Sequence, residues 1–100
     1  MEKIVLIDEI LSFLGNNFEL LGKKDGIIIN NAKPILEADK NSVCWINPKK
    51  NDKYELIKNT KACLVICDNS IMIDNAILKD KAIIKVDNPK LVFLRIVERR

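Results

Sequence analysis

The residues best suited to ligand chemistry gather around Asn47, directly after a short apolar run. An asparagine amide has two N–H donors and one acceptor, so Asn47 is able to pair with the edge of a nucleobase. Lys49 and Lys50 follow at once and are placed to meet a diphosphate. Trp45 and Tyr54 bracket the same junction, and an aromatic ring at a strand end is able to stack on a base. The pattern therefore predicts a nucleotide site built from these five residues.

Each of these residues also has a purely structural interpretation. Asn47 followed by Pro48 is typical of a helix start, because asparagine caps free backbone N–H groups and proline fits the first helical position. Trp45 is equally able to pack in a core, and Tyr54 to pack a helix on a sheet. Lysines at such positions are commonly solvated. Both interpretations stay open at this point.

The chain contains no histidine. This removes the Ser-His-Asp, Cys-His and histidine acid–base schemes, and no motif points to catalysis by lysine or carboxylates. The cysteines, Cys44, Cys63 and Cys67, are odd in number and have no CxxC spacing, so we expect buried apolar residues rather than metal ligands. We therefore expect no metal, no cofactor and no complete enzyme in this chain.

The apolar periodicity defines the elements that must position the site. We expect helices near residues 6–15, 49–59 and 89–99, strands near 18–21, 26–29, 43–46, 62–67 and 82–86, a turn at 23–26 and a loop at 30–34. The 62–67 strand is apolar on both faces, which predicts a central place in a covered sheet. The alternation of strands and helices predicts an α/β fold, a small single domain in which helices flank a mixed sheet.

A strand followed by Asn-Pro and then a helix is expected twice, at Asn47-Pro48 and at Asn88-Pro89. In open α/β sheets, ligands bind outside the carboxyl ends of strands, where helix N-termini favour phosphate. Asn47 is expected at such a strand end. The last helix carries four consecutive apolar residues, 91–94, which cover more than one helical face. We expect that helix either to be deeply buried or to pack as well against a part of a longer protein.

The composition excludes several classes. Seventeen basic and 14 acidic residues give a net charge of +3, too mild for a nucleic-acid interface. No apolar run reaches the length of a membrane span, and the first residues lack a signal-peptide pattern. We expect a cytoplasmic domain without nucleic-acid or membrane contacts.

Three anchors, in this order, carry a resemblance to a known family: residues 42–49 (SVCWINPK), residues 59–66 (NTKACLVI) and residues 86–93 (VDNPKLVF). The chain resembles the N-terminal uridine-binding domain of the UDP-3-O-(3-hydroxyacyl)glucosamine N-acyltransferases, the LpxD family of lipid A biosynthesis. The opening, from Leu6 to Leu20, fits the first helix of that family more loosely.

The resemblance implies an α/β module, similar to the N-terminal domain of the Mur ligases, that binds the uracil end of a UDP-sugar. It implies a parent protein in which a left-handed β-helix, absent from this chain, carries the catalytic histidine, forms a homotrimer and binds acyl carrier protein. The parent would be an acyl-carrier-protein-dependent N-acyltransferase. The alternative is a non-catalytic interaction module that keeps the fold without nucleotide binding.

The chain departs from the family at the two positions that sandwich the base. Cys44 and Lys50 stand where the family has aromatic residues, whereas Asn47 matches. Trp45 comes one residue after the first of these positions, and a shift of one residue along a strand moves a side chain to the other face of the sheet. Tyr54 comes four residues late, after an apparent insertion.

Overall fold

The structure is a computed structural model that describes residues 5–15, 17–22 and 27–98. Its elements in chain order are β1 (Val5–Leu6), α1 (Ile7–Leu14), β2 (Glu19–Leu21), β3 (Ile28–Ile29), β4 (Asn31–Ala32), β5 (Ser42–Trp45), α2 (Lys53–Asn59), β6 (Leu64–Asp68), β7 (Ala82–Val86) and α3 (Pro89–Glu98). The expected turn at 23–26 lies outside the described residues.

The main sheet has five strands in the order β2-β7-β6-β5-β4. Strands β4 to β7 are parallel to one another, and β2 joins β7 in the antiparallel direction. A separate antiparallel pair joins β1 to β3, with Leu6 opposite Ile28. The expected α/β fold with a mixed sheet is therefore confirmed.

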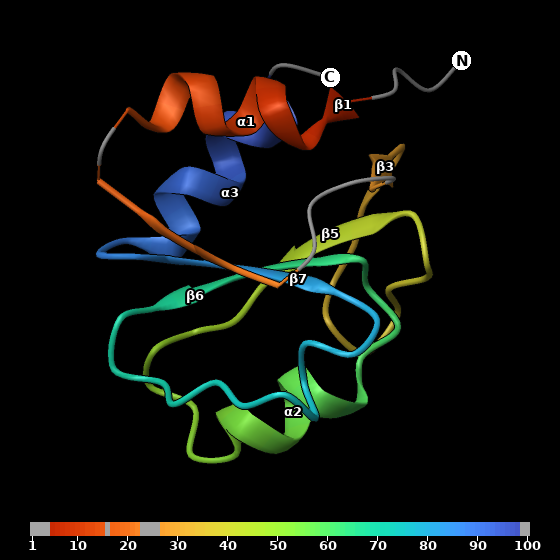
Figure 1. The fold of residues 1–100 in the computed structure, drawn as a ribbon, viewed down its shortest axis with the longest axis vertical. Helices are drawn as coiled ribbons and strands as arrows, with labels where there is room; N and C mark the ends of the chain where they lie inside the picture. The colour runs from red at the N-terminus through yellow and green to blue at the C-terminus, as the bar shows by residue number, and fades with distance from the viewer. Residues whose placement is uncertain (1–4, 16, 23–26, 99–100) are drawn as a thin grey trace.

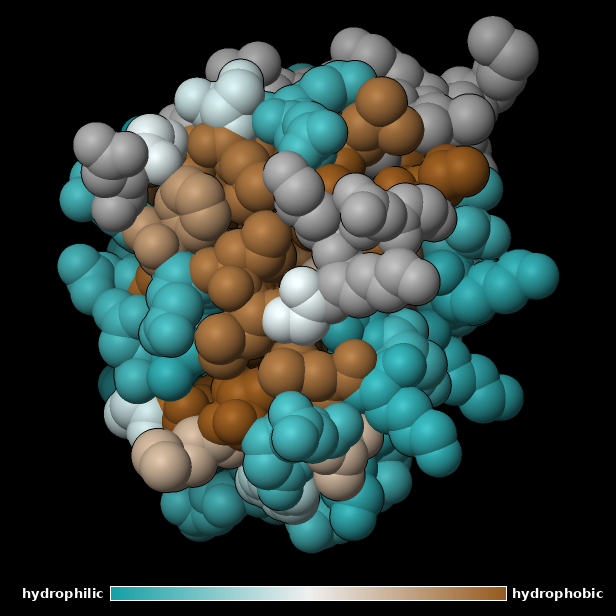
Figure 2. Space-filling model, viewed as in Figure 1, coloured by the Kyte–Doolittle hydropathy of each residue, from teal (hydrophilic) through white to brown (hydrophobic). Residues whose placement is uncertain are grey.

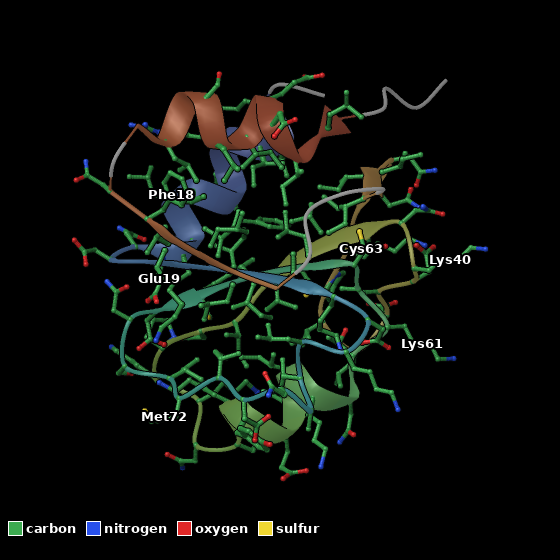
Figure 3. All side chains as sticks on the ribbon, viewed as in Figure 1. Phe18, Glu19, Lys40, Lys61, Cys63 and Met72 are labelled. Atoms are coloured by element: carbon green, nitrogen blue, oxygen red, sulfur yellow. The ribbon has the colours of Figure 1, made fainter. Side chains whose placement is uncertain are left out.

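Helices cover both faces of the sheet (Figure 1): α1 and α3 lie on one face and α2 on the other. We call them the α3 face and the α2 face. Alternate residues of each strand enter the two cores, as the two-residue strand period requires. On β5, Val43 and Trp45 belong to the α3-face core, whereas Cys44 belongs to the α2-face core. Phe18, just before β2, packs into the α3-face core (Figure 3).

The central strand is β6, as its apolar sequence predicts. All five of its residues are buried, and it is paired on both sides, by β5 and β7. The expected loop at 30–34 is wrong at Asn31 and Ala32, which form β4 against Ser42 and Val43. Asparagine and alanine favour strands weakly, so this two-residue edge strand depends on its neighbour rather than on its own composition.

The first and last helices follow the expected bounds closely. Helix α1 buries Ile7 and Ile10 and ends at Gly15, whose φ of 66° suits glycine. Helix α3 buries Val92 and Ile96 but leaves a row of apolar residues exposed on another side. None of the helices in the described part of the chain combines the length and apolar character that a membrane crossing requires.

One surface of the molecule carries a band of apolar side chains over α1 and β2 (Figure 2). Strand β2 is an edge of the main sheet, so the residues beside it are only partly covered. The half-buried apolar residues of these elements are Leu11, Leu14, Leu20 and Leu21.

Candidate ligand-binding site

The carboxyl ends of the four parallel strands meet at one edge of the sheet. Lys33 follows β4, Asn69 follows β6 and Asp87 follows β7. The backbone N–H of Ile46 still bonds to the Ile66 carbonyl, so Asn47 is the first residue beyond the β5 pairing. The Asn69 amide donates a 2.6 Å hydrogen bond to Asp87, which ties two of these loops together. This edge is where the fold class places ligands.

Asn47 shapes a turn rather than a helix start. Its side-chain Oδ1 accepts the Lys49 N–H at 2.9 Å, and its carbonyl accepts the Lys50 N–H at 3.0 Å. Helix α2 begins only at Lys53, with Asp52 as the residue before it, so the expected helix over 49–59 is too long at its start. The capping interpretation of Asn47 is therefore wrong, because five residues, 48–52, separate it from the helix.

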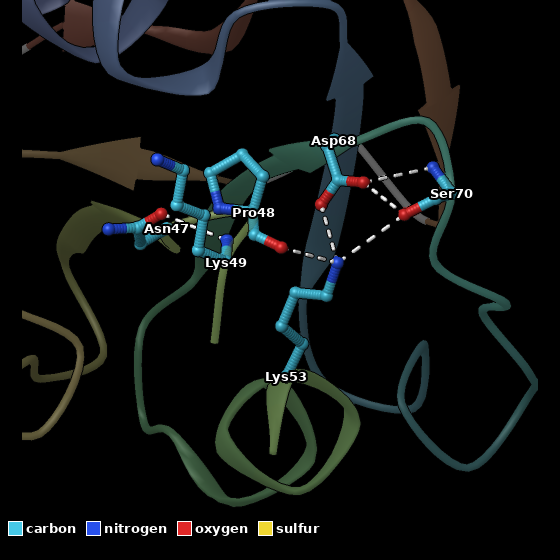
Figure 4. A network of polar contacts seen from close by, with 6 residues as sticks. All are labelled: Asn47, Pro48, Lys49, Lys53, Asp68 and Ser70. Atoms are coloured by element: carbon cyan, nitrogen blue, oxygen red, sulfur yellow. Dashed lines mark hydrogen bonds and ion pairs between the residues drawn. The ribbon is translucent and has the colours of Figure 1, made fainter. Parts of the chain in front are cut away.

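The same interpretation is confirmed at the second Asn-Pro junction. Asn88 Oδ1 accepts the Leu91 N–H at 3.1 Å, and Pro89 is the first residue of α3. The two junctions share a sequence and differ in function. Since Asn47 is exposed and its acceptor is used within the turn, its amide nitrogen is left to face outward (Figure 4).

A lysine fastens the Asn47 turn to the end of β6 (Figure 4). Lys53 Nζ donates to the Pro48 carbonyl at 3.0 Å, to Asp68 Oδ1 at 3.2 Å and to Ser70 Oγ at 3.3 Å. The side chains of Lys53 and Asp68 are only 19% and 12% exposed, so water screens this ion pair poorly. The network holds the candidate site in one geometry.

Asp68 is the acidic member of the Lys53 network. Burial on its own raises the pKa of Asp68, but hydrogen bonds from Ser70 and the contact with Lys53 outweigh it, so the pKa lies below its ordinary value. Asp68 is therefore ionised at neutral pH and carries the negative charge that pairs with Lys53.

Trp45 lines a small hollow on the α3 face. Its ring lies 6.5 Å from that of Phe93, at an interplanar angle of 43°. The hollow has a volume of about 240 Å³, and Ala32, Lys33 and Pro34 complete its wall. That volume is below the roughly 300–1,000 Å³ of a typical small-molecule pocket, so it suits a single ring system.

Tyr54 lies on the α2 face, away from that hollow. Its hydroxyl donates a 2.6 Å hydrogen bond to Asp74, and that bond is the main cause that raises the tyrosine pKa. The two rings that flank the Asn47 junction therefore lie on opposite faces of the sheet and do not share one hollow. Tyr54 fastens α2 to the segment before β7 instead.

The two positions at which the LpxD family has aromatic residues offer no ring here. Cys44 is fully buried in the α2-face core, and burial raises the pKa of its thiol to about 12, so it is also unreactive. Lys50 is exposed, as is Lys49. Both lysines lie in the turn that Asn47 forms.

Phe93 and Lys33 line the hollow but were not predicted from the sequence. Phe93 belongs to the apolar run of α3, in which no residue stands out, and Lys33 follows a strand of only two residues. Among the described residues, no cluster of three or more cysteines and carboxylates is able to hold a metal ion. No protein-family model matches the chain, and no curated protein is significantly similar to it.

Proposed function

We propose that this domain recognises the nucleotide of a UDP-sugar on behalf of an acyltransferase. In this proposal the base rests on Trp45 in the hollow beside Phe93, and the outward amide of Asn47 meets the nucleotide at the same sheet edge. Asn47 follows Trp45, the last residue of β5, by two residues, so both lie at the carboxyl end of that strand. Lys49 supplies positive charge for the phosphates, whereas Lys33 lies 3.8 Å from the Asp39 carboxylate, which offsets part of its charge.

The observation that carries the proposal is a half-buried tryptophan at the carboxyl edge of a parallel sheet, paired with a second aromatic ring around a hollow. An aromatic ring in such a place is able to stack on any of the nucleobases, and each stacked base contributes about 1–3 kcal/mol to the free energy of binding. The three sequence segments that resemble the LpxD family, in the same order, favour a UDP-sugar as the class of ligand. The likeness to the Mur ligase N-terminal domain is part of the same proposal.

The remaining functions of the parent enzyme would lie outside this domain. Acyl transfer, acyl carrier protein binding and the trimer contacts belong, in this proposal, to a second domain. This division agrees with a chain that contains no histidine.

The test uses the single tryptophan as its probe. We expect UDP-N-acetylglucosamine and UMP to change the emission of Trp45 in a saturable way, whereas N-acetylglucosamine 1-phosphate, which lacks the base, leaves it unchanged. Asn47→Ala should weaken the response about tenfold, as the loss of one hydrogen bond of about 1–1.5 kcal/mol implies. An unchanged emission at millimolar UMP, together with an unchanged melting temperature, would rule the proposal out.

A second candidate function is an interaction module without nucleotide binding. The observation in its favour is the row of Leu91, Leu94 and Val97 on α3, which are 47%, 45% and 38% exposed. Their spacing places them along one side of the helix. This candidate predicts that Leu94→Ser leaves the domain folded and abolishes its contact with the rest of the parent protein, while nucleotides have no effect on stability.

A further inference from the structure

Two hollows lie at the opposite edge of the sheet, where the segments that precede β5, β6 and β7 meet. The first, of about 610 Å³, runs between residues 35–39 and one side of α2. The second, of about 650 Å³, lies between Lys40, Lys58 and Asp80. Both are lined by Asp39, Asn59, Thr60 and Lys61, so they form one continuous trough, which we call the edge trough.

The two ends of the edge trough carry opposite charges. The end formed by the first hollow has the exposed carboxylates Glu37, Asp52 and Glu55. The other end has the exposed lysines Lys40 and Lys58, and the exposed Lys61 is shared by both hollows. Figure 3 shows Lys40 and Lys61 reaching out from the same side of the molecule.

Asp80, at the basic end, is paired within the chain. It lies 3.1 Å from Nζ of Lys81, whose side chain is only 3% exposed, and therefore balances a buried charge. Asp39, which lines both hollows, lies 3.8 Å from Nζ of Lys33. Helix α2 contributes charge to both ends, with Glu55 at one and Lys58 at the other.

The acidic end has an apolar floor and an apolar lip. Ile35, Ala38 and Leu56 are buried or half-buried along it, whereas Leu36 on the lip is 83% exposed. A protein that presents a leucine of its own would fill this hollow. The chain itself carries both such a leucine and such a hollow.

We propose that the edge trough is a self-association surface, in which two copies of this chain pair about a two-fold axis. A two-fold interface requires a patch that is complementary to itself, so that each residue and its partner meet twice. With α2 of one copy antiparallel to α2 of the other, Glu55 of each copy faces Lys58 of its mate. A ligand of one charge sign is disfavoured, because one end of the trough would repel it.

The first experiment measures mass against protein concentration by sedimentation velocity. We expect the average mass to rise from 11.4 kDa toward twice that value at low salt. In 1 M NaCl the rise should be much weaker, because the screening length falls to about 3 Å. A chain that stays monomeric at low salt up to its solubility limit would overturn the proposal.

Charge reversal provides the sharper test. Glu55→Lys and Lys58→Glu should each remain monomeric at concentrations at which the wild-type chain associates. An equimolar mixture of the two variants should associate again, because both Glu55–Lys58 contacts are restored with the charges exchanged. Glu98→Lys is the matched control. It lies at an exposed position of α3 and changes the net charge as Glu55→Lys does, so this variant should associate like the wild type.

A loop variant keeps the proposal testable if the helix variants fail to fold. Leu36→Ser lies outside the helices and strands, so its melting temperature should match that of the wild type at low concentration. Its association should be weakened at least fivefold. Association unchanged by Leu36→Ser, or a charge-exchanged mixture of folded variants that stays monomeric, would overturn the self-association surface.

Discussion

Trp45 and Tyr54 lie on opposite faces of the five-stranded sheet, although both flank the Asn47 turn. Trp45 packs beside Phe93 on the α3 face, and Tyr54 bonds to Asp74 on the α2 face. A nucleobase that contacts one of these rings is therefore shielded from the other.

This arrangement predicts different outcomes for the two rings in nucleotide binding. Tyr54→Phe should change the affinity for UMP by less than twofold, since the lost hydroxyl bonds to Asp74 rather than to a ligand. Trp45→Leu should reduce the UMP-induced rise in melting temperature to the noise level. Isothermal titration and thermal denaturation of both variants would check this. If Tyr54→Phe weakened binding as strongly as Trp45→Leu, the site would have to be placed on the α2 face.

The contact between Lys53 and Asp68 predicts a loss of stability. Lys53→Met should lower the free energy of unfolding by about 1–3 kcal/mol, because it leaves a largely buried carboxylate without its cation. Urea denaturation at pH 7 measures the difference. Lys49→Met, an exposed lysine in the same turn, is the matched control and should change stability by less than about 0.5 kcal/mol.

The Lys53 effect should also depend on pH. The pKa of Asp68 lies below its ordinary value of 3.8 in the folded state. Its contribution to stability is then complete above that value and is lost as the pH falls through the lower folded pKa. The wild-type chain and Lys53→Met should converge in stability as the pH falls through the folded pKa of Asp68. A constant difference down to pH 2 would show that packing, not charge, causes the loss.

The fold was largely predictable from the sequence because its apolar runs are long enough to define elements. The strand at 82–86 and the helix from residue 89 follow directly from such runs. Strand β4 was not predictable, since two residues of weak strand preference pair only because Ser42 and Val43 offer an edge. Local sequence does not contain that neighbour.

The candidate site was predictable in place but not in composition. The carboxyl edge and Asn47 followed from a strand that ends in Asn-Pro. The residues that surround Trp45 could not be predicted. Phe93 lies on a helix distant in sequence, and the packing of that helix on the sheet decides where the Phe93 side chain points. The identical Asn-Pro pairs behave differently since Pro89 enters α3 directly, whereas Pro48 is followed by a turn that Lys53 closes.

Gly22 is predicted to be intolerant of any side chain. Its φ is 89°, and a Cβ there would lie 2.7 Å from the backbone oxygen of Lys81. Gly22→Ala should cost about 3 kcal/mol or more, because backbone strain and a clash with main chain add. Gly15→Ala is the control: φ is also positive at 66°, but nothing lies within 4 Å, so only the strain of about 1–2 kcal/mol remains. If urea denaturation gave equal losses of unfolding free energy for the two variants, the predicted clash at Gly22 would be contradicted.

The two Asn-Pro junctions give a final matched pair. Asn88→Ala should lower the free energy of unfolding by about 1 kcal/mol, because it removes the acceptor that caps the Leu91 N–H at the start of α3. Asn47→Ala removes only a contact within an exposed turn and should cost less than about 0.5 kcal/mol. Thermal and urea denaturation of both variants would measure the contrast. If Asn47→Ala proved the more damaging, the turn would be a structural requirement of the fold, and the loss of nucleotide response in that variant would no longer identify a ligand contact.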